Sequence, residues 1–165
     1  MKETVIREYR AGDAEALWAV YFSAIHHVAA ADYTEEQIDA WAPENIDPSE
    51  WSKRVSGIAP FVAERDGTIV GYADVQQSGY IDHFFVAAGA TRQGVGSLLM
   101  DRIHFTALSA GLQSLFSDVS ITARPFFEHW GFEVEGRQNL VVNGVSLANF
   151  RMRKSRLTFK WSRRA

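Results

Sequence analysis

Residues 80–100, YIDHFFVAAGATRQGVGSLLM, constrain the fold more than any other stretch of this sequence. An apolar, strand-like run ends at Val86, an Ala- and Gly-rich connection follows, and Gly94 opens an apparent helix. The first N–H groups of a helix have no internal partner and lie at the positive end of the helix dipole. Glycine lets an anion approach these N–H groups closely. The stretch therefore predicts an anion-binding glycine loop, formed by Arg92, Gln93, Gly94, Val95, Gly96 and Ser97.

The remaining sequence alternates between strand and helix patterns. Asp66-Gly67 and Asn143-Gly144 predict hairpin turns, and Thr34 with Gln37 predicts a helix-capping box. We expect strands at residues 4–9, 61–65, 68–75, 80–86, 112–119, 132–142 and 145–152. We expect helices at residues 13–31, after Thr34, after Asp47, at residues 94–111 and in a short segment that ends at Trp130. This order predicts one mixed α/β domain over residues 1–154 and a basic tail over residues 155–165.

Composition excludes several classes of protein. The chain has 165 residues and 47% hydrophobic content, which is enough for a substantial core. It has no cysteine, which excludes disulfides, thiolate zinc sites and a cysteine nucleophile. We expect no metal, because His26 and His27 lack the spacing of a metal motif. No signal peptide or membrane span is evident, so we expect a cytoplasmic protein without a membrane partner. The net charge of −3 gives no general basis for binding nucleic acid.

Charge is distributed unevenly along the chain. Residues 11–52 contain nine acids and no Lys or Arg. The same segment carries aromatic side chains and two histidines: Trp18, Tyr21, His26, His27, Tyr33 and Trp41. It could form an acidic, aromatic rim for a cationic or aromatic amine. Alternatively, the aromatic residues belong to the core, and the acids form a solvated face with stabilising positions near helix N-termini.

The glycine loop and a later segment together resemble the GNAT family of acyl-CoA N-acyltransferases. Both glycines of the family's loop motif match Gly94 and Gly96, whereas Thr91 stands where Arg or Gln is usual. In the later segment Ala123, Gly131 and Phe132 match the family pattern. Two positions of that segment depart from it: Ser120 replaces an Asn, and Phe127 replaces a Tyr.

This resemblance implies a GNAT-like fold, with a mostly antiparallel mixed sheet flanked by helices and one splayed pair of parallel strands. It implies acetyl-CoA as co-substrate, held where strands 80–86 and 112–119 separate. The pantetheine arm would pair with the backbone of Phe84, Phe85 and Val86, and the pyrophosphate would lie on residues 92–97. Phe127 would pack near the sulfur.

The implied reaction is direct attack of a primary amine on the thioester. The acceptor would be a small molecule or a peptide. The attacking amine must lose a proton, and His83 and Asp118 are the principal candidates to accept it. Ser120 could donate a proton or bind the coenzyme, although helix capping is its simpler role. Asp82, Glu128 and His129 are weaker candidates. A backbone N–H near Phe85 or Val86 would stabilise the oxyanion.

Other functions stay open at this point. Because Phe127 cannot act as an acid and Thr91 departs from the motif, the chain could be a non-catalytic acyl-CoA-binding regulatory module. A hydroxyl acceptor would fit the same cleft. A homodimer is compatible with the sequence. The basic tail could touch nucleic acid, but a surface-packed or frayed end is the commoner role of such a segment.

Overall fold

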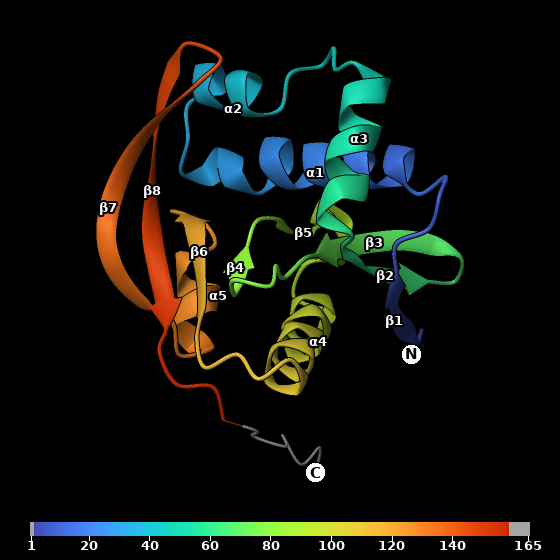
Figure 1. Ribbon diagram of the computed structural model, residues 1–165. Coiled ribbons are helices and arrows are strands. Elements are labelled where there is room, and N and C mark those ends of the chain that lie inside the picture. The colour runs from blue at the N-terminus through green and yellow to red at the C-terminus, as the bar shows by residue number, and fades with distance from the viewer. Residues whose placement is uncertain (1, 159–165) are drawn as a thin grey trace.

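The computed structural model describes residues 2–158, which form two sheets flanked by helices, with β7 and β8 at one outer edge (Figure 1). In chain order the strands are β1 (Thr4–Glu8), β2 (Phe61–Arg65), β3 (Thr68–Ala73), β4 (Tyr80–Ile81), β5 (Phe84–Val86), β6 (Leu115–Ser120), β7 (Glu133–Val142) and β8 (Val145–Lys154). The α-helices are α1 (Ala14–His27), α2 (Glu35–Trp41), α3 (Pro48–Ile58), α4 (Val95–Ser109) and α5 (Arg124–His129), with short 3-10 helices at Ala29–Ala31 and Ala88–Ala90.

The strands form two four-stranded sheets in the described part of the chain. The first has the order β1-β2-β3-β5 and is antiparallel. The second has the order β4-β6-β8-β7, in which β4 and β6 run parallel and the other pairs are antiparallel. The expected mixed sheet with one parallel pair is therefore confirmed. The expected single strand over residues 80–86 was wrong: it is divided into β4 and β5, and each half belongs to a different sheet.

A buried carboxylate divides that strand. Asp74 is fully buried, and its Oδ1 accepts the backbone N–H of Asp82 at 3.0 Å and of His83 at 2.5 Å. Its Oδ2 accepts the side-chain amide of Gln76 at 2.5 Å. Because the two residues between β4 and β5 donate their N–H groups to a side chain, the chain changes sheets without leaving these donors unpaired.

Local sequence signals set the helix boundaries. The capping box at the start of α2 is present: Gln37 N–H donates to Thr34 Oγ1 at 3.2 Å, and Thr34 N–H donates to Gln37 Oε1 at 2.9 Å. Asp47 caps α3, with Pro48 at its first position as expected. The helix expected over 13–31 ends earlier, at His27, and a separate 3-10 turn follows.

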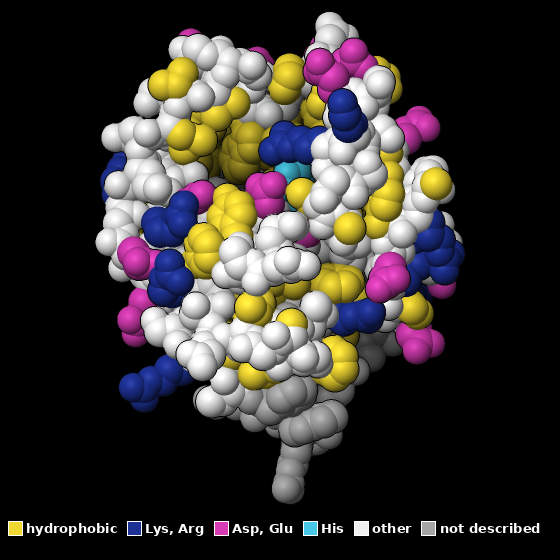
Figure 2. All heavy atoms as spheres, viewed as in Figure 1, with side chains coloured by type: hydrophobic (Ala, Val, Ile, Leu, Met, Phe, Trp, Pro, Cys, Tyr) yellow, Lys and Arg dark blue, Asp and Glu magenta, His cyan; other side chains and the backbone are white. Residues whose placement is uncertain are grey.

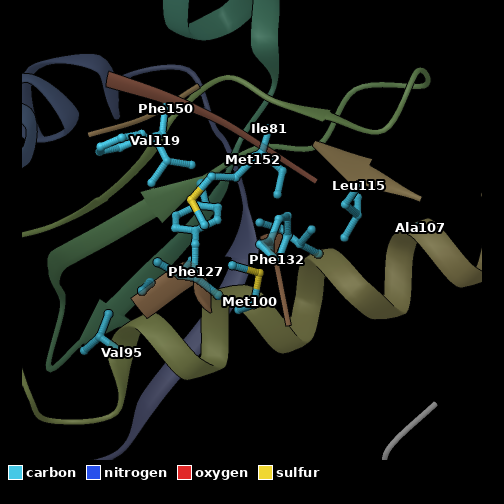
Figure 3. Packing of buried hydrophobic residues seen from close by; sticks show 14 of the residues in the cluster. Ile81, Val95, Met100, Ala107, Leu115, Val119, Phe127, Phe132, Phe150 and Met152 are labelled. Atoms are coloured by element: carbon cyan, nitrogen blue, oxygen red, sulfur yellow. The ribbon is translucent and has the colours of Figure 1, made fainter. Parts of the chain in front are cut away.

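Two hydrophobic clusters fill the interior. One joins α4 and α5 to the second sheet, with Met100, Phe127, Phe132 and Met152 packed together (Figure 3). The other lies under α1 and α3 and includes Leu17, Ile25, Trp51 and Tyr72. The first cluster includes residues of both sheets, and each cluster contributes side chains to the cavities described below.

The end of the described chain stays close to the domain. Leu157 N–H donates to Gln113 O at 3.2 Å, so packing continues past β8. Residues 159–165 of the predicted basic tail lie outside the described residues, and the boundary at 154 stays a prediction. Within residues 2–158, no helix combines the length and apolarity required to cross a membrane.

We expect Asp74→Ala to lower the free energy of unfolding by about 2–4 kcal/mol, because it removes the acceptor of the buried His83 N–H and of the partly buried Asp82 N–H. Asp74→Asn retains an oxygen acceptor and should lose less. Urea denaturation measures both, and Asp39→Asn, an exposed substitution on α2, is the matched control. If Asp74→Ala unfolds with the same free energy as wild type, Asp74 does not stabilise the division between β4 and β5.

Asp74 also predicts a pH dependence of stability. Burial raises its pKa to about 6, above roughly 4 for an unfolded Asp. The native state therefore holds this proton more tightly, and its stabilising contribution is complete below pH ~4. That contribution declines by about 3 kcal/mol as the pH rises through 6. The free energy of unfolding of wild type, relative to that of Asp74→Asn, should therefore fall between pH 4 and pH 7.5. A difference that stays constant over this range would contradict the raised pKa of Asp74.

Candidate active site

Two adjoining cavities lie near the point where the two sheets separate. One has a volume of about 390 Å³, and we call it the larger cavity of this pair. It is bounded by β5, α1, the start of α4 and the segment leading into α5. Eight predicted cofactor-binding residues line it: Phe84, Phe85, Val86, Arg92, Gly94, Gly96, Ser97 and Phe127. The side chains of the other two point elsewhere. Gln93 bonds to Arg65, and Val95 is buried in the core.

The glycine loop has the backbone that its sequence suggested. Gly94 precedes the first turn of α4 with φ of +83°, a conformation that glycine adopts without strain. At Gly96 a Cβ would lie 3.2 Å from the Phe126 ring, so a side chain there would press against α5. Arg92 is exposed and lines the cavity. The loop therefore offers helix N-terminal N–H groups and a cation to an anion.

Strand β5 leaves one backbone edge facing the split. It is the last strand of the first sheet and pairs on its other side with β3. Its neighbour in the chain, β4, pairs instead with β6 in the second sheet. An extended ligand in the larger cavity could therefore hydrogen-bond to β5 as an additional strand.

A second cavity, of about 220 Å³, adjoins the first, and we call it the smaller cavity. Trp41, Phe85 and Ser120 line both cavities. Figure 2 shows a hollow with apolar walls and, at its edge, a basic side chain, an acidic side chain and a histidine. The smaller cavity is lined by Tyr21, Tyr33, Trp41, Arg54, Tyr80, Asp82, His83, Phe85, Asp118, Ser120, Leu140, Val142, Leu147, Ala148 and Asn149.

His83 lies in the wall of the smaller cavity and is only 1% exposed. Burial, reinforced by the positive charge of Arg54, lowers its pKa to about 3, so the ring is neutral at pH 7. Its Nδ1 lies 2.9 Å from the hydroxyl of Tyr72, which is fully buried and has no other hydrogen-bond partner in the described structure. Because that hydroxyl needs an acceptor, the geometry favours Tyr72 O–H donating to Nδ1, which leaves the ring proton on Nε2.

Asp118 is bound by three neighbours. Its Oδ1 accepts from Arg151 Nε at 2.8 Å and from Gln138 Nε2 at 2.7 Å, and its Oδ2 accepts from the Tyr80 hydroxyl at 3.0 Å. Partial burial acts to raise the pKa of Asp118, but these hydrogen bonds outweigh it and lower the pKa. The geometry therefore makes Asp118 a weakly basic carboxylate that orients Tyr80.

The remaining sequence candidates fall into two groups. Ser120 Oγ accepts the N–H of Ala123 at 3.0 Å, which caps the turn before α5 and leaves its own O–H free to donate. Asp82 has no side-chain hydrogen bond in the described structure, and burial raises its pKa. By contrast, Glu128 and His129 lie exposed on α5, line neither cavity, and Glu128 pairs with Arg124.

The acidic segment contributes aromatic rings, not acids, to the smaller cavity. Tyr21, Tyr33 and Trp41 line it, whereas none of the nine acids does. His26 bonds to Ala42 O, and His27 is exposed. No group of three or more His, Cys, Asp or Glu residues that could hold a metal occurs within residues 2–158.

Sequence reasoning missed three residues of the site. Arg54 projects from α3 to the smaller cavity, Tyr72 bonds to His83, and Asp74 holds the strand division. Arg54 is the first arginine after the long segment without basic residues, which is the one signal that could have singled it out.

Comparison with known proteins places the chain in a family. Residues 29–154 match the model of the acetyltransferase (GNAT) domain, which covers more than half of the sequence. The chain therefore belongs to the GNAT acetyltransferase family and is an acyl-CoA-dependent N-acyltransferase, with acetyl-CoA as co-substrate. The resemblance noted from the sequence is confirmed.

Individual relatives agree with this assignment. The chain is 35% identical over 153 residues to YafP, an uncharacterised N-acetyltransferase of Escherichia coli, covering 93% of this chain and 97% of the relative. A GCN5-related N-acetyltransferase from Rhodopseudomonas palustris is 32% identical, with a TM-score of 0.88 and coverage of 94% and 97%. PaiA N-acetyltransferase from Thermoplasma acidophilum, solved with coenzyme A, shares the fold at 18% identity, with a TM-score of 0.68 and coverage of 93% and 99%.

The state of His83 can be measured directly. We expect its ring to stay neutral between pH 5 and pH 8, with the proton on Nε2, because burial opposes the charged form and Tyr72 donates to Nδ1. ¹⁵N NMR of the histidine rings distinguishes both tautomers and the charged form, and His83→Gln identifies the signal. A titration midpoint near 6.5 would contradict the effect of burial, and a proton on Nδ1 would contradict the assigned hydrogen bond.

Proposed function

We propose that this chain transfers the acetyl group of acetyl-CoA to the primary amine of a small molecule by direct attack on the thioester. The observation that carries the proposal is the meeting of two cavities at Phe85 and Ser120. The larger cavity ends at the glycine loop and suits the coenzyme, whereas the smaller one is lined by aromatic and ionisable groups. A thioester at the junction would be open to an amine from the smaller cavity.

In this proposal the coenzyme is held mainly by backbone groups. The pantetheine arm pairs with the free edge of β5 at Phe84, Phe85 and Val86. The pyrophosphate binds the N–H groups of the glycine loop, and Arg92 supplies a positive charge. Phe127 is 2% exposed and lies against Phe84, so it forms an apolar wall near the sulfur.

The reaction requires two proton transfers. The amine nitrogen forms a bond to the carbonyl carbon and loses a proton, and the C–S bond then breaks to release the coenzyme as a thiolate, which takes up a proton. A backbone N–H near Phe85 or Val86 stabilises the intermediate oxyanion. Ser120 has a free O–H at the junction and is our candidate to protonate the thiolate.

Three side chains of the smaller cavity are candidates to accept the proton of the amine: His83, Asp118 and Asp82. For His83 to accept a proton at Nε2, its Nδ1 would have to donate to Tyr72, and the Tyr72 hydroxyl would then lack an acceptor. Asp118 is already held by Arg151. Asp82 faces the smaller cavity without a partner and has a raised pKa, so we favour it as the base. His83 would then bind the acceptor or a water through Nε2–H.

The small volume favours a small acceptor over a long peptide segment. At about 220 Å³ the smaller cavity is below the range typical of drug-sized ligands. A non-catalytic acyl-CoA-binding role gains no support, because family membership indicates an enzyme and the smaller cavity provides a place for an acceptor.

Substitution of Gly94 tests the coenzyme site. Gly94→Asp should weaken acetyl-CoA binding at least tenfold, because a carboxylate at the N-terminus of α4 repels the pyrophosphate. Gly94→Asn is the matched control, since Asn has the same size and tolerates positive φ without the charge. Isothermal titration calorimetry measures both affinities. Equal binding by the Asp and Asn variants would contradict the proposed phosphate site.

A second set of variants separates the proton-transfer roles. Asp82→Asn should lower kcat at least a hundredfold if Asp82 is the base. His83→Gln retains an N–H donor and should cost less, whereas a larger loss in His83→Gln would return the base role to His83. Ser120→Ala should lower kcat about tenfold or more without weakening acetyl-CoA binding. Release of free thiol in an amine panel gives the rates.

A further inference from the structure

Arg54 is the only Lys or Arg among the described residues that line the smaller cavity. Its side chain extends from α3 and is exposed, and its positive charge acts on both the Tyr21 hydroxyl and Asp82. No carboxylate lies within 4.0 Å of its guanidinium in the described structure. Arg54 therefore has guanidinium N–H donors available for an anion in the smaller cavity.

Asp82 supplies the opposite charge in the same cavity. Its carboxylate accepts no hydrogen bond in the described structure, although the charge of Arg54 acts on it. The other cavity carboxylate, Asp118, is already neutralised by Arg151. The smaller cavity therefore presents one unpaired cation and one unpaired anion, more than 4.0 Å apart.

Much of the remaining lining of the smaller cavity is apolar. Tyr33, Trp41 and Phe85 contribute aromatic surface, and Leu140, Val142 and Leu147 contribute aliphatic surface. The hydroxyl of Tyr33 is not free to bind a ligand, because it donates to Ala148 O and accepts from Ile121 N–H. These walls suit an uncharged organic group more than a second charged one.

We infer that the acceptor is a small zwitterion with an apolar side group: an amine whose carboxylate binds Arg54 and whose ammonium binds Asp82. The inference rests on the proposed function and names its substrate class. A free α-amino acid has both charges on adjacent groups. The amine of a peptide carries a neutral carbonyl in place of the carboxylate, so Arg54 distinguishes free amino acids from peptide N-termini and from simple amines.

The test compares acceptors that differ only in this charge. Wild-type enzyme is assayed by thiol release with L-phenylalanine, L-leucine, L-methionine and L-tryptophan, and with the corresponding amino acid amides. We expect at least one acid to exceed its amide about tenfold or more in kcat/KM, the range of a hydrogen bond between charged groups. Arg54→Gln should reduce that ratio to about one, mainly by raising KM for the acid.

Lys53→Gln is the matched control, because it removes the same charge from the adjacent residue of α3, which does not line the smaller cavity. It should retain the acid-to-amide ratio of the wild type. Arg54→Lys should recover part of the ratio, since it restores the charge without the bidentate geometry.

The possible failures are distinguishable. If wild type acetylates amides or simple amines as well as the acids, or if Arg54→Gln slows both series equally, the inference is overturned while the proposed function stands. If wild type binds no acetyl-CoA in calorimetry, or releases no thiol with any amine, the proposed function fails and the inference falls with it.

Discussion

The hydrogen bonds from Asp82 and His83 to the buried carboxylate of Asp74 determine much of the site's geometry. They turn the chain between β4 and β5, so that one strand pairs with β6 and the next with β3. The same turn leaves an edge of β5 open, directs Asp82 toward the smaller cavity and buries His83. A continuous strand would have paired along its length and closed the split. Burial of the Asp74 carboxylate costs free energy. The cost is offset because the carboxylate accepts two backbone N–H groups that have no partner in a neighbouring strand.

Electrostatics in the site depend on which charges are already paired. Asp118 and Arg151 neutralise each other, and Arg7, which lines neither cavity, pairs with Asp13 and Glu64. Burial keeps His83 uncharged, so it contributes a dipole and no net charge. Within residues 2–158, Arg54 and Asp82 have no charged partner within 4.0 Å. The acidity of residues 11–52 is misleading in this respect, since those acids lie outside the smaller cavity. Overall charge in a segment therefore gives little information about the charge that a bound molecule would meet.

Features that depend on neighbours in sequence were predictable. Gly94 requires positive φ, Thr34 and Gln37 form a capping box, and Asp66-Gly67 turns a hairpin, because each signal acts within a few residues. Eight of the ten predicted coenzyme-binding residues line the larger cavity. Those of the glycine loop follow from the local sequence, whereas Phe84, Phe85, Val86 and Phe127 were predicted from the family resemblance. The strand division was not predictable, since its cause, Asp74, lies eight and nine residues away and acts through a tertiary contact. The pairing of Tyr72 with His83 and the position of Arg54 over the cavity likewise arise only when separate elements pack together.

Phe127 stands where the family pattern has a tyrosine, so α5 supplies no hydroxyl at this position. Its ring packs against Phe84 and Phe132 and lines the larger cavity, where it provides apolar surface and no proton donor. Ser120 stands at the junction of the two cavities, at the end of β6, with its oxygen already accepting from Ala123. This hydrogen bond orients the serine and leaves its proton directed elsewhere. A group on β6 could therefore supply the proton that α5 cannot, and the departures at positions 120 and 127 would compensate for each other within one mechanism.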